Sequence, residues 1–220
     1  TPEFRLGCKR ILLSDAWYPA LAEPQVEVVT DAIREVRAHS VVTADGKERE
    51  LDTLILATGF RVTDTAGPGR IYGRGGVSLS HRWSGSPQAY LGTAVAGFPN
   101  LFLLAGPNLG PGHTSVVFYI ESQVRYILDC LEQMERRGAA SVEVRQDVQD
   151  AYNRTIQERM RGSVWTTGGC TSWYLDKNGR NTTLWPGFSW ELRLRARRFD
   201  PESYRMESVG ATNSGTPVAA

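Results

Sequence analysis

Cysteine is scarce in this sequence. The 220 residues include three cysteines, Cys8, Cys130 and Cys170, which lie far apart and form no C-x-x-C pair. An odd number of widely spaced cysteines argues against a disulfide framework. With three histidines as the other soft ligands, we expect no metal site. These absences favour a reducing, cytoplasmic compartment.

Excess charge and long apolar runs are also missing. The formal net charge is +1, so no strong field attracts nucleic acid or acidic lipid. No apolar run approaches the roughly 20 residues of a membrane span, and no signal-peptide pattern opens the chain. No G-x-G-x-x-G follows a strand-like segment, so the usual phosphate-binding turn of a dinucleotide-binding fold is not found. The hydrophobic content of 41% is still sufficient for a core.

Short apolar runs predict several strands. Ile11–Ser14, Val26–Val29 and Leu101–Ala105 are strand-like, and Leu51–Ala57 has almost no polar break after Thr53. That density predicts burial on both faces, as in a parallel sheet. Further strand candidates are Ile33–Val36, Val41–Ala44 and Val77–Leu79, and Asp45-Gly46 is a hairpin turn signal.

Two helices are expected in the second half. The first runs from Ser115 to about Glu135 and ends before Gly138, and the second runs from Asp147 to about Met160. The apolar residues of the first recur at helical spacing: Val116, Ile120, Val124, Ile127, Leu128 and Leu131. The final residues, SVGATNSGTPVAA, read as a disordered tail.

Glycines follow two of the strand-like runs. Thr58-Gly59 ends LDTLILATGF, where bare backbone could approach a ligand or could simply turn. Gly106, Gly110 and Gly112 precede the first helix, whose N-terminus favours a partial negative charge. The alternative is an ordinary loop with Thr114 or Ser115 capping the helix.

Two further groups of residues have two interpretations each. Lys9-Arg10 is either a solvated surface pair or a phosphate contact from Lys9 beside a fixed cation from Arg10. Four tryptophans, Trp165, Trp173, Trp185 and Trp190, lie close together in sequence and are typical of a core or domain seam. Trp173 could instead stack on a ligand or donate its N–H to one.

Several motifs occur in an order that resembles one family. They are GCKRILLSDAWYPAL (Gly7–Leu21), LDTLILATGF, AYLGTAVAGFPNLFLLAGPN (Ala89–Asn108), IESQVRYI (Ile120–Ile127) and SWY (Ser172–Tyr174). This set resembles the C-terminal half of the class B flavoprotein monooxygenases, which include flavin-containing and Baeyer–Villiger monooxygenases. The Lys9-Arg10 pair and Trp173 are more similar to the Baeyer–Villiger members. The segment NGRNTTLWPG (Asn178–Gly187) differs from the best-known members.

The resemblance implies an α/β flavoprotein fold with two dinucleotide-binding (Rossmann-like) domains, here partial and truncated at the N-terminus. It implies an FAD- and NADPH-dependent enzyme in which a C4a-peroxyflavin oxygenates a ketone to an ester or lactone, with O2 as co-substrate. Arg10 matches the catalytic arginine, which also contacts the nicotinamide. Lys9, Thr58, Gly59, Gly106, Val116 and Trp173 match cofactor-binding positions. Lys9 corresponds to a lysine near the NADPH 2′-phosphate.

The resemblance also implies a domain division and a missing partner. Residues 1–57 correspond to the end of the NADPH-binding domain, 58–205 to the C-terminal part of the FAD-binding domain with the C-terminal region, and 206–220 to the tail. The N-terminal half of the same enzyme is absent, and the isolated chain is expected to be inactive. The alternatives are hydroxylation at nitrogen or sulfur, or a non-catalytic remnant or split subunit.

Overall fold

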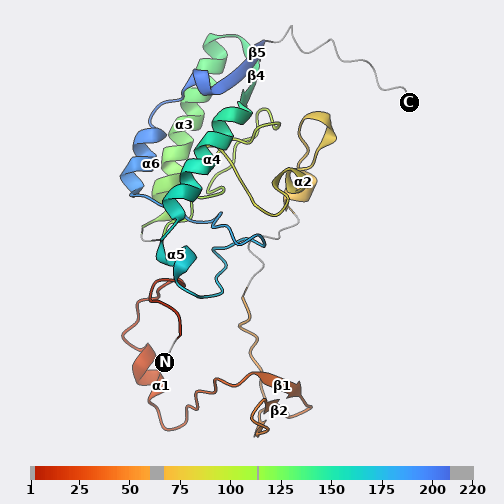
Figure 1. Cartoon of the computed structure of the whole chain (residues 1–220), viewed down its shortest axis with the longest axis vertical. Helices are drawn as coiled ribbons and strands as arrows, with labels where there is room; N and C mark the ends of the chain where they lie inside the picture. The colour runs from red at the N-terminus through yellow and green to blue at the C-terminus, as the bar shows by residue number, and fades with distance from the viewer. Residues whose placement is uncertain (1–2, 60–66, 113, 209–220) are drawn as a thin grey trace, which may run out of the picture. The chain divides into compact units, whose positions relative to one another are not determined.

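A computed structural model describes residues 3–59, 67–112 and 114–208 (Figure 1). The chain forms two compact units, Ile11–Phe60 and a larger unit of Thr1–Arg10 with Arg61–Ala220. The α-helices are α1 (Trp17–Leu21), α2 (Leu79–Trp83), α3 (Val116–Arg136), α4 (Gln146–Met160), α5 (Val164–Thr167) and α6 (Ser189–Arg195). The strands are β1 (Ile33–Val36), β2 (Ser40–Thr43), β3 (Glu48–Glu50), β4 (Ala139–Val144) and β5 (Tyr204–Ser208). Short 3₁₀ helices span Gly67–Arg70, Arg74–Gly76 and Pro201–Ser203.

The smaller unit contains α1 and a three-stranded antiparallel sheet in the order β1-β2-β3. The central strand, β2, is buried along its length and pairs with both neighbours. The turn to β3 confirms the hairpin predicted at Asp45-Gly46. Gly46 has a φ of +85°, which favours glycine, and Asp45 Oδ1 accepts a hydrogen bond of 3.1 Å from the Lys47 backbone N–H.

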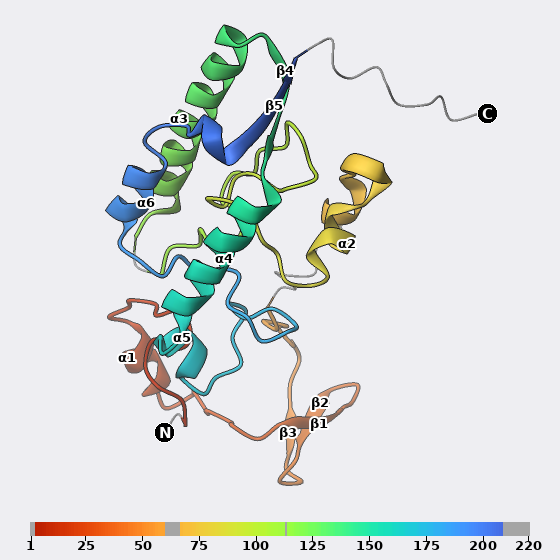
Figure 2. The same cartoon turned by 45° about the horizontal axis from the view of Figure 1, so that its top comes forward.

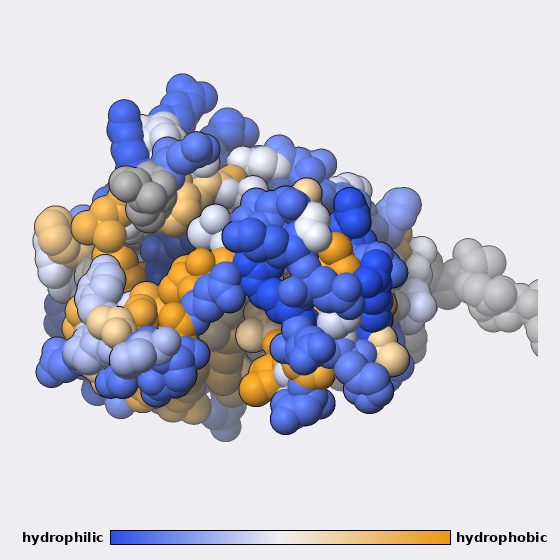
Figure 3. Space-filling model, turned by 90° about the horizontal axis from the view of Figure 1, so that it is seen from below, coloured by the Kyte–Doolittle hydropathy of each residue, from blue (hydrophilic) through white to orange (hydrophobic). Residues whose placement is uncertain are grey.

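Three predicted strands of this unit do not form. Ile11–Ser14, Val26–Val29 and Leu51–Ala57 are not in strands, and Leu13, Ile55 and Leu56 are 95%, 84% and 75% exposed. The predicted burial of Leu51–Ala57 on both faces is therefore wrong for this structure. A parallel strand needs partners at its edges and layers on its faces, and the described part of the chain supplies neither here. Figure 3 shows hydrophobic residues exposed on one face of the molecule.

The larger unit is built around α3. Both predicted helices are confirmed, because α3 and α4 begin and end within one or two residues of the expected positions. Ser115 caps α3 by accepting a 3.2 Å hydrogen bond from the Val117 N–H, and Gly138 has a φ of +60° just after the helix ends. β4 and β5 pair antiparallel. Figures 1 and 2 show α6 beside α3.

The core of this unit is rich in tyrosine. Tyr126 of α3 donates a 2.9 Å hydrogen bond to the hydroxyl oxygen of Tyr204 in β5, and both rings are buried. Tyr152 of α4 belongs to the same cluster, as does Phe199. Tyr90 packs edge-on against Tyr152 and Tyr204. The cluster joins α3, α4 and the β4–β5 pair into one layer of packing.

The buried face of α3 is not the one marked by its aliphatic residues. Tyr119, Gln123, Tyr126 and Cys130 are at most 1% exposed. The aliphatic residues whose spacing predicts the helix lie on the adjacent face and remain half-buried or exposed. The helix was predictable from this spacing, but its orientation was not.

Two predicted strands of the larger unit are replaced by other structure. Val77–Leu79 does not form a strand, because Ser78 caps α2 by accepting a 3.2 Å hydrogen bond from the His81 N–H. Leu101–Ala105 is not a strand either, and it makes one isolated bridge, between Phe102 and Ala94. The expected tail overlaps β5 as far as Ser208, and its remainder lies outside the described residues.

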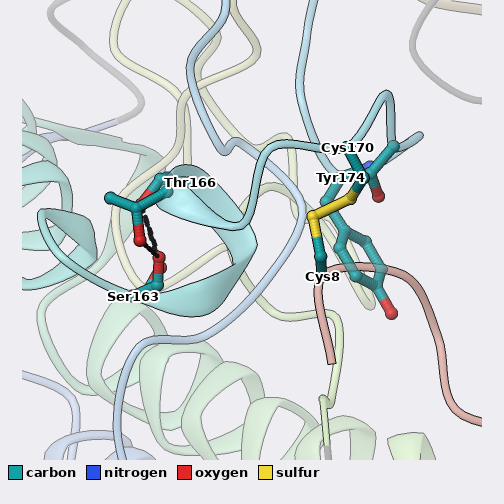
Figure 4. Close-up of a disulfide and its surroundings, with 7 residues drawn as sticks. Cys8, Ser163, Thr166, Cys170 and Tyr174 are labelled. Atoms are coloured by element: carbon teal, nitrogen blue, oxygen red, sulfur yellow. Dashed lines mark hydrogen bonds between the residues drawn. A yellow bond between two sulfur atoms is a disulfide. The ribbon is translucent and has the colours of Figure 1, made fainter. Parts of the chain in front are cut away.

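A disulfide joins Cys8 to Cys170, contrary to the expectation from the cysteine spacing (Figure 4). Their Cα atoms are 6.1 Å apart although 162 residues separate them in sequence. Spacing could not reveal this pair, because the fold brings the two segments together: the Arg5 N–H also donates to the Gly168 carbonyl at 2.9 Å. Cys130 is a free, buried thiol.

Candidate functional site

An open pocket of about 380 Å³ lies in the larger unit, at the N-terminal end of α3. Its lining is mostly apolar and aromatic, with two threonines. The lining residues are Pro68, Trp83, Pro87, Ala105, Gly106, Pro107, Gly110, Val116, Trp173, Thr182 and Thr183. Three of the predicted cofactor-binding residues, Gly106, Val116 and Trp173, therefore meet in one cavity.

The loop that follows Ala105 forms one wall of the pocket. Gly106 permits this path, because a Cβ there would collide with the Gly92 carbonyl oxygen. Asn108 has a φ of +58° and is buried. Its Nδ2 donates to the carbonyl oxygens of Asn181 and Leu184 at 2.8 and 3.0 Å. Asn108 thus fixes the loop to the chain around Leu184.

The backbone of residues 181–185 runs alongside this loop. The Gly110 N–H donates to the Thr183 carbonyl at 2.7 Å, and the Trp185 N–H donates to the Gly110 carbonyl at 3.1 Å. A Cβ at Gly110 would lie 2.7 Å from that Thr183 oxygen, so only glycine fits without a shift. This pairing carries Thr182 and Thr183 into the pocket wall.

The wall at the start of α3 is supported from beneath by Gln123. Its side chain is fully buried, and Oε1 accepts from the Ala105 N–H at 2.8 Å. Nε2 donates to the Gly92 and Leu103 carbonyls, both at 3.0 Å, and to Thr93 Oγ1 at 2.8 Å. One side chain therefore positions the run that leads into Gly106.

The four tryptophans have different environments. Trp173 is 43% exposed, lines the pocket and packs against the Tyr174 ring at 4.7 Å between centroids. Trp185 is buried in the main core, and Trp165 packs against a second core cluster. Trp190 is 56% exposed. The core interpretation therefore fits Trp185, whereas Trp173 lines the pocket.

Arg10 contacts the far end of the loop that follows Ala105. Its Nη1 donates a 3.3 Å hydrogen bond to the Pro111 carbonyl. The disulfide anchors the chain just before Arg10, because it links Cys8 to Cys170, which lies in the segment that continues to Tyr174 (Figure 4). Burial raises the pKa of the Tyr174 hydroxyl, and Arg10 offsets part of that rise. A permanent cation is thus held beside the pocket loop.

Lys9 is not among the residues that line the pocket, and the other two predicted residues belong to the smaller unit. Lys9 is exposed, and its Nζ lies 4.6 Å from the centre of the Phe4 ring in a cation–π contact. Thr58 and Gly59 are exposed residues of the smaller unit, and Gly59 has a φ of +85°.

Sequence reasoning missed the residues opposite the loop. Trp83, Thr182 and Thr183 line the pocket but belong to no motif that predicted a site. The available signal was the unusual segment NGRNTTLWPG, which contains both threonines. The position of Thr182 and Thr183 in the pocket wall depends on backbone pairing with Gly110, which no local pattern predicts.

The pocket suits a flat, largely apolar ring system with polar edges. Prolines, Val116 and two indole rings supply apolar surface, and the threonine hydroxyls can donate or accept hydrogen bonds. Asn108 Oδ1 is buried and has no donor among the described residues. Within residues 3–59, 67–112 and 114–208, no three His, Cys, Asp or Glu side chains gather as metal ligands would.

Comparison with known proteins identifies relatives over the whole chain. A Baeyer–Villiger monooxygenase of Pseudomonas aeruginosa is 48% identical over 221 residues, which cover 100% of this chain and 41% of that protein. A Baeyer–Villiger monooxygenase of Streptomyces coelicolor is 46% identical and is covered to 42% of its length. The chain thus spans less than half of these relatives. No family model matches the sequence.

Solved structures give the same result for the fold. Cyclohexanone monooxygenase from Rhodococcus sp. Phi1, bound to NADP⁺, aligns with a TM-score of 0.77 at 30% identity, over 92% of this chain and 39% of that one. An oxidised steroid monooxygenase bound to NADP aligns with a TM-score of 0.77 at 27% identity, over 94% and 40%. These matches confirm the resemblance and the partial flavoprotein fold.

No helix among the described residues has the length and hydrophobicity needed to cross a bilayer.

Proposed function

Because this chain is, over its whole length, a relative of the Baeyer–Villiger flavoprotein monooxygenases, we propose that it forms part of an FAD- and NADPH-dependent enzyme that oxygenates ketones to esters or lactones. The observation that carries the proposal is the convergence of predicted residues in the larger unit. Gly106, Val116 and Trp173 line one pocket, and Arg10 is bonded to the loop that forms its wall.

The pocket is compatible with the proposed cofactors. Its apolar walls can hold a ring system, and the hydroxyls of Thr182 and Thr183 can form hydrogen bonds with polar edges of that system. When bound, FAD supplies the oxygen-activating redox chemistry, and NADPH supplies the electrons. The phosphate-binding turns would come from the part of the relatives that this chain does not match. Thr58 and Gly59 would contribute at the junction between the two cofactor domains.

The side chains of this chain have separate roles in the proposal. Arg10 stabilises negative charge that develops during oxygenation and orients the nicotinamide, since a guanidinium remains protonated at any working pH. Trp173 positions the ribose side of the nicotinamide cofactor. Val116 and Gly106 allow close approach of the flavin to the start of α3. Lys9 contacts the 2′-phosphate of NADPH.

A chimera tests the proposal in a complete enzyme. The segment of the Pseudomonas aeruginosa relative that this chain matches is replaced by residues 1–220, and the relative itself serves as the positive control. We expect purified chimera to contain FAD and to convert a cyclic ketone to a lactone at the expense of NADPH. Product analysis with ¹⁸O2 should place one labelled oxygen atom in the lactone.

The same assay separates the alternatives. A sulfoxide from a thioether without any lactone would assign the chain to heteroatom oxygenation. A folded chimera that contains FAD and consumes NADPH but releases only hydrogen peroxide would refute oxygenation of both substrate classes.

A pair of tryptophan variants tests the pocket. Trp173→Ala should lower lactone formed per NADPH consumed, because it removes a contact of the bound cofactor. Trp190→Ala, a change at an exposed tryptophan that does not line this pocket, should leave this ratio unchanged.

A further inference from the structure

Cys8 and Cys170 form a disulfide to which the proposed function assigns no role. Cys8 is 1% exposed, whereas Cys170 is partly exposed, so a small thiol can reach the bond from the Cys170 side. Exchange between thiols and disulfides begins when a thiolate attacks one sulfur atom, and access to a single sulfur is sufficient. Accessible disulfides are typically the labile ones, whereas fully buried structural disulfides resist reduction. This bond is therefore open to reduction and to re-formation.

The disulfide joins the segment Arg5–Arg10 to the chain around Gly168. The chain that follows Arg10 leaves the larger unit and forms the smaller one. Two hydrogen bonds accompany the disulfide: the Arg5 N–H donates to the Gly168 carbonyl at 2.9 Å, and Arg10 Nη1 donates to the Pro111 carbonyl at 3.3 Å. Each such bond contributes little to stability once water competes for its groups. The covalent bond is therefore the strongest tie between this segment and the larger unit.

The backbone beside both cysteines is shaped for a close approach. A Cβ at Gly168 would lie 2.6 Å from the Cys8 Cβ and 2.7 Å from its Sγ, so only glycine lets the two segments meet. Gly7 and Gly169, which directly precede the two cysteines, have φ values of +89° and +78°. Both values fall in the left-handed region that favours glycine. The contact between the segments thus depends on the residues around the bond and not on the cysteines alone.

Both segments continue from the disulfide to residues assigned to the pocket. Arg10 is two residues after Cys8, and Trp173 is three residues after Cys170. Tyr174 connects the two, since its ring lies 4.7 Å from the Trp173 ring and its hydroxyl has a pKa that Arg10 lowers against the effect of burial. Figure 4 shows Tyr174 beside the disulfide. The bond, the cation and the pocket tryptophan therefore form one connected group.

We propose that Cys8 and Cys170 are a redox-controlled modification site, at which thiol–disulfide exchange determines whether Arg10 is held at the pocket loop; the consequence for oxygenation rests on the proposed function. In reduction, one thiolate of a dithiol attacks Cys170 Sγ, the bond to Cys8 breaks, and Cys8 leaves as a thiolate that takes up a proton. The second thiolate of the dithiol attacks the mixed disulfide and releases Cys170. The protein gains two electrons and the dithiol becomes a disulfide. Oxidation by that disulfide reverses these steps.

A redox titration of the full chain tests the site without any activity. The chain is equilibrated in mixtures of reduced and oxidised dithiothreitol, quenched in acid, denatured and alkylated, and its thiols are counted by mass. The count should rise from one to three as the mixture becomes more reducing and return to one on reoxidation, with Cys130 as the constant thiol.

Hydrogen exchange on the same samples reports whether the segment is released. In the reduced chain, exchange at the Arg5 amide should accelerate about tenfold or more, because its bond to the Gly168 carbonyl loses its covalent support. The Ala105 amide, which Gln123 holds from within α3, is the internal control and should exchange at an unchanged rate.

The chimera tests the consequence for the pocket. Reduction should lower lactone formation by about tenfold or more, because a small displacement of a positioned group is costly, and reoxidation should restore it. Cys8→Ser/Cys170→Ser should stay at the reduced level and respond to neither form of the reagent. Cys130→Ala removes the buried thiol outside the bond and should keep the full response. Circular dichroism and the melting temperature verify that each variant is folded.

Three outcomes would overturn the proposal. The first is one thiol in every mixture that leaves the chain folded, which would make the bond permanent. The second is three thiols in every mixture, which would mean that the bond does not form. The third is a complete titration that leaves exchange at the Arg5 amide, or lactone formation by the chimera, unchanged. If titration and exchange behave as expected but the oxidised chimera forms no lactone, the redox site stands and the proposed function fails.

Discussion

Gln123 allows a quantitative test of how the pocket wall is held. Gln123→Leu removes four hydrogen bonds of 2.8–3.0 Å at a fully buried position. Thr93 Oγ1 retains its own bond to the Leu91 carbonyl, so we count the Ala105 N–H and the Gly92 and Leu103 carbonyls as the groups left without a partner. At about 1–3 kcal/mol for each unsatisfied group, less the gain from burying leucine, the expected loss is about 3–5 kcal/mol.

Urea unfolding measures this loss directly, and hydrogen exchange at the Ala105 amide should accelerate. Gln133→Leu, near the end of the same helix and only partly buried, is the control and should shift the free energy of unfolding by less than about 0.5 kcal/mol. A second variant, Gln123→Glu, can still accept from the Ala105 N–H but loses its amide donors. It should regain stability as the pH falls, because protonation of the buried carboxylate restores one donor.

If the free energy of unfolding of Gln123→Leu lies within about 1 kcal/mol of the wild-type value, Gln123 does not hold the pocket wall. That result would mean that the backbone groups find water or other partners, and the loop would not depend on Gln123.

Three further predictions concern the cysteines, alkaline pH and Lys9. The oxidised chain should show no reactive thiol when native and one, Cys130, when denatured without reductant; three thiols there would contradict the Cys8–Cys170 bond. Burial raises the pKa of the Cys130 thiol to about 12. Stability should therefore hold below pH 9.0 and fall as the pH rises above it, and the fall should steepen above pH 10.0 because burial also raises the pKa of the Tyr126 and Tyr204 hydroxyls; a flat profile to pH 11 would contradict this. In the chimera, Lys9→Ala should raise the KM for NADPH while kcat changes little, and an unchanged KM would remove Lys9 from the 2′-phosphate.

Local signals predicted those elements whose stabilisation is local. The hairpin at Asp45-Gly46 forms because the turn itself fixes it, and α3 begins at its cap, Ser115. The extended runs were not predictable in the same way. Leu51–Ala57 has a strand sequence, but a parallel strand depends on neighbours that no local pattern supplies.

The residues of the site also differ in whether the sequence could predict them. The glycine loop and Trp173 were predictable as a set from the family resemblance, and they do line one pocket. Thr182 and Thr183 were not, because Asn108 and Gly110 bring them in through long-range backbone pairing. The disulfide was missed for the same reason, since its two cysteines are 162 residues apart.

The most direct test of the account is the lactone yield of the chimera when Arg10 is changed. The structure places the Arg10 guanidinium on the Pro111 carbonyl beside the pocket, and the proposal assigns it charge stabilisation during oxygenation. Arg10→Ala should retain FAD and a normal melting temperature but lose about 100- to 1000-fold in lactone formation. Arg10→Lys should recover little, because an ammonium lacks the planar fork of the guanidinium. Lactone formation by Arg10→Ala at the rate of the unmodified chimera would contradict the central claim that this pocket is an oxygenation site.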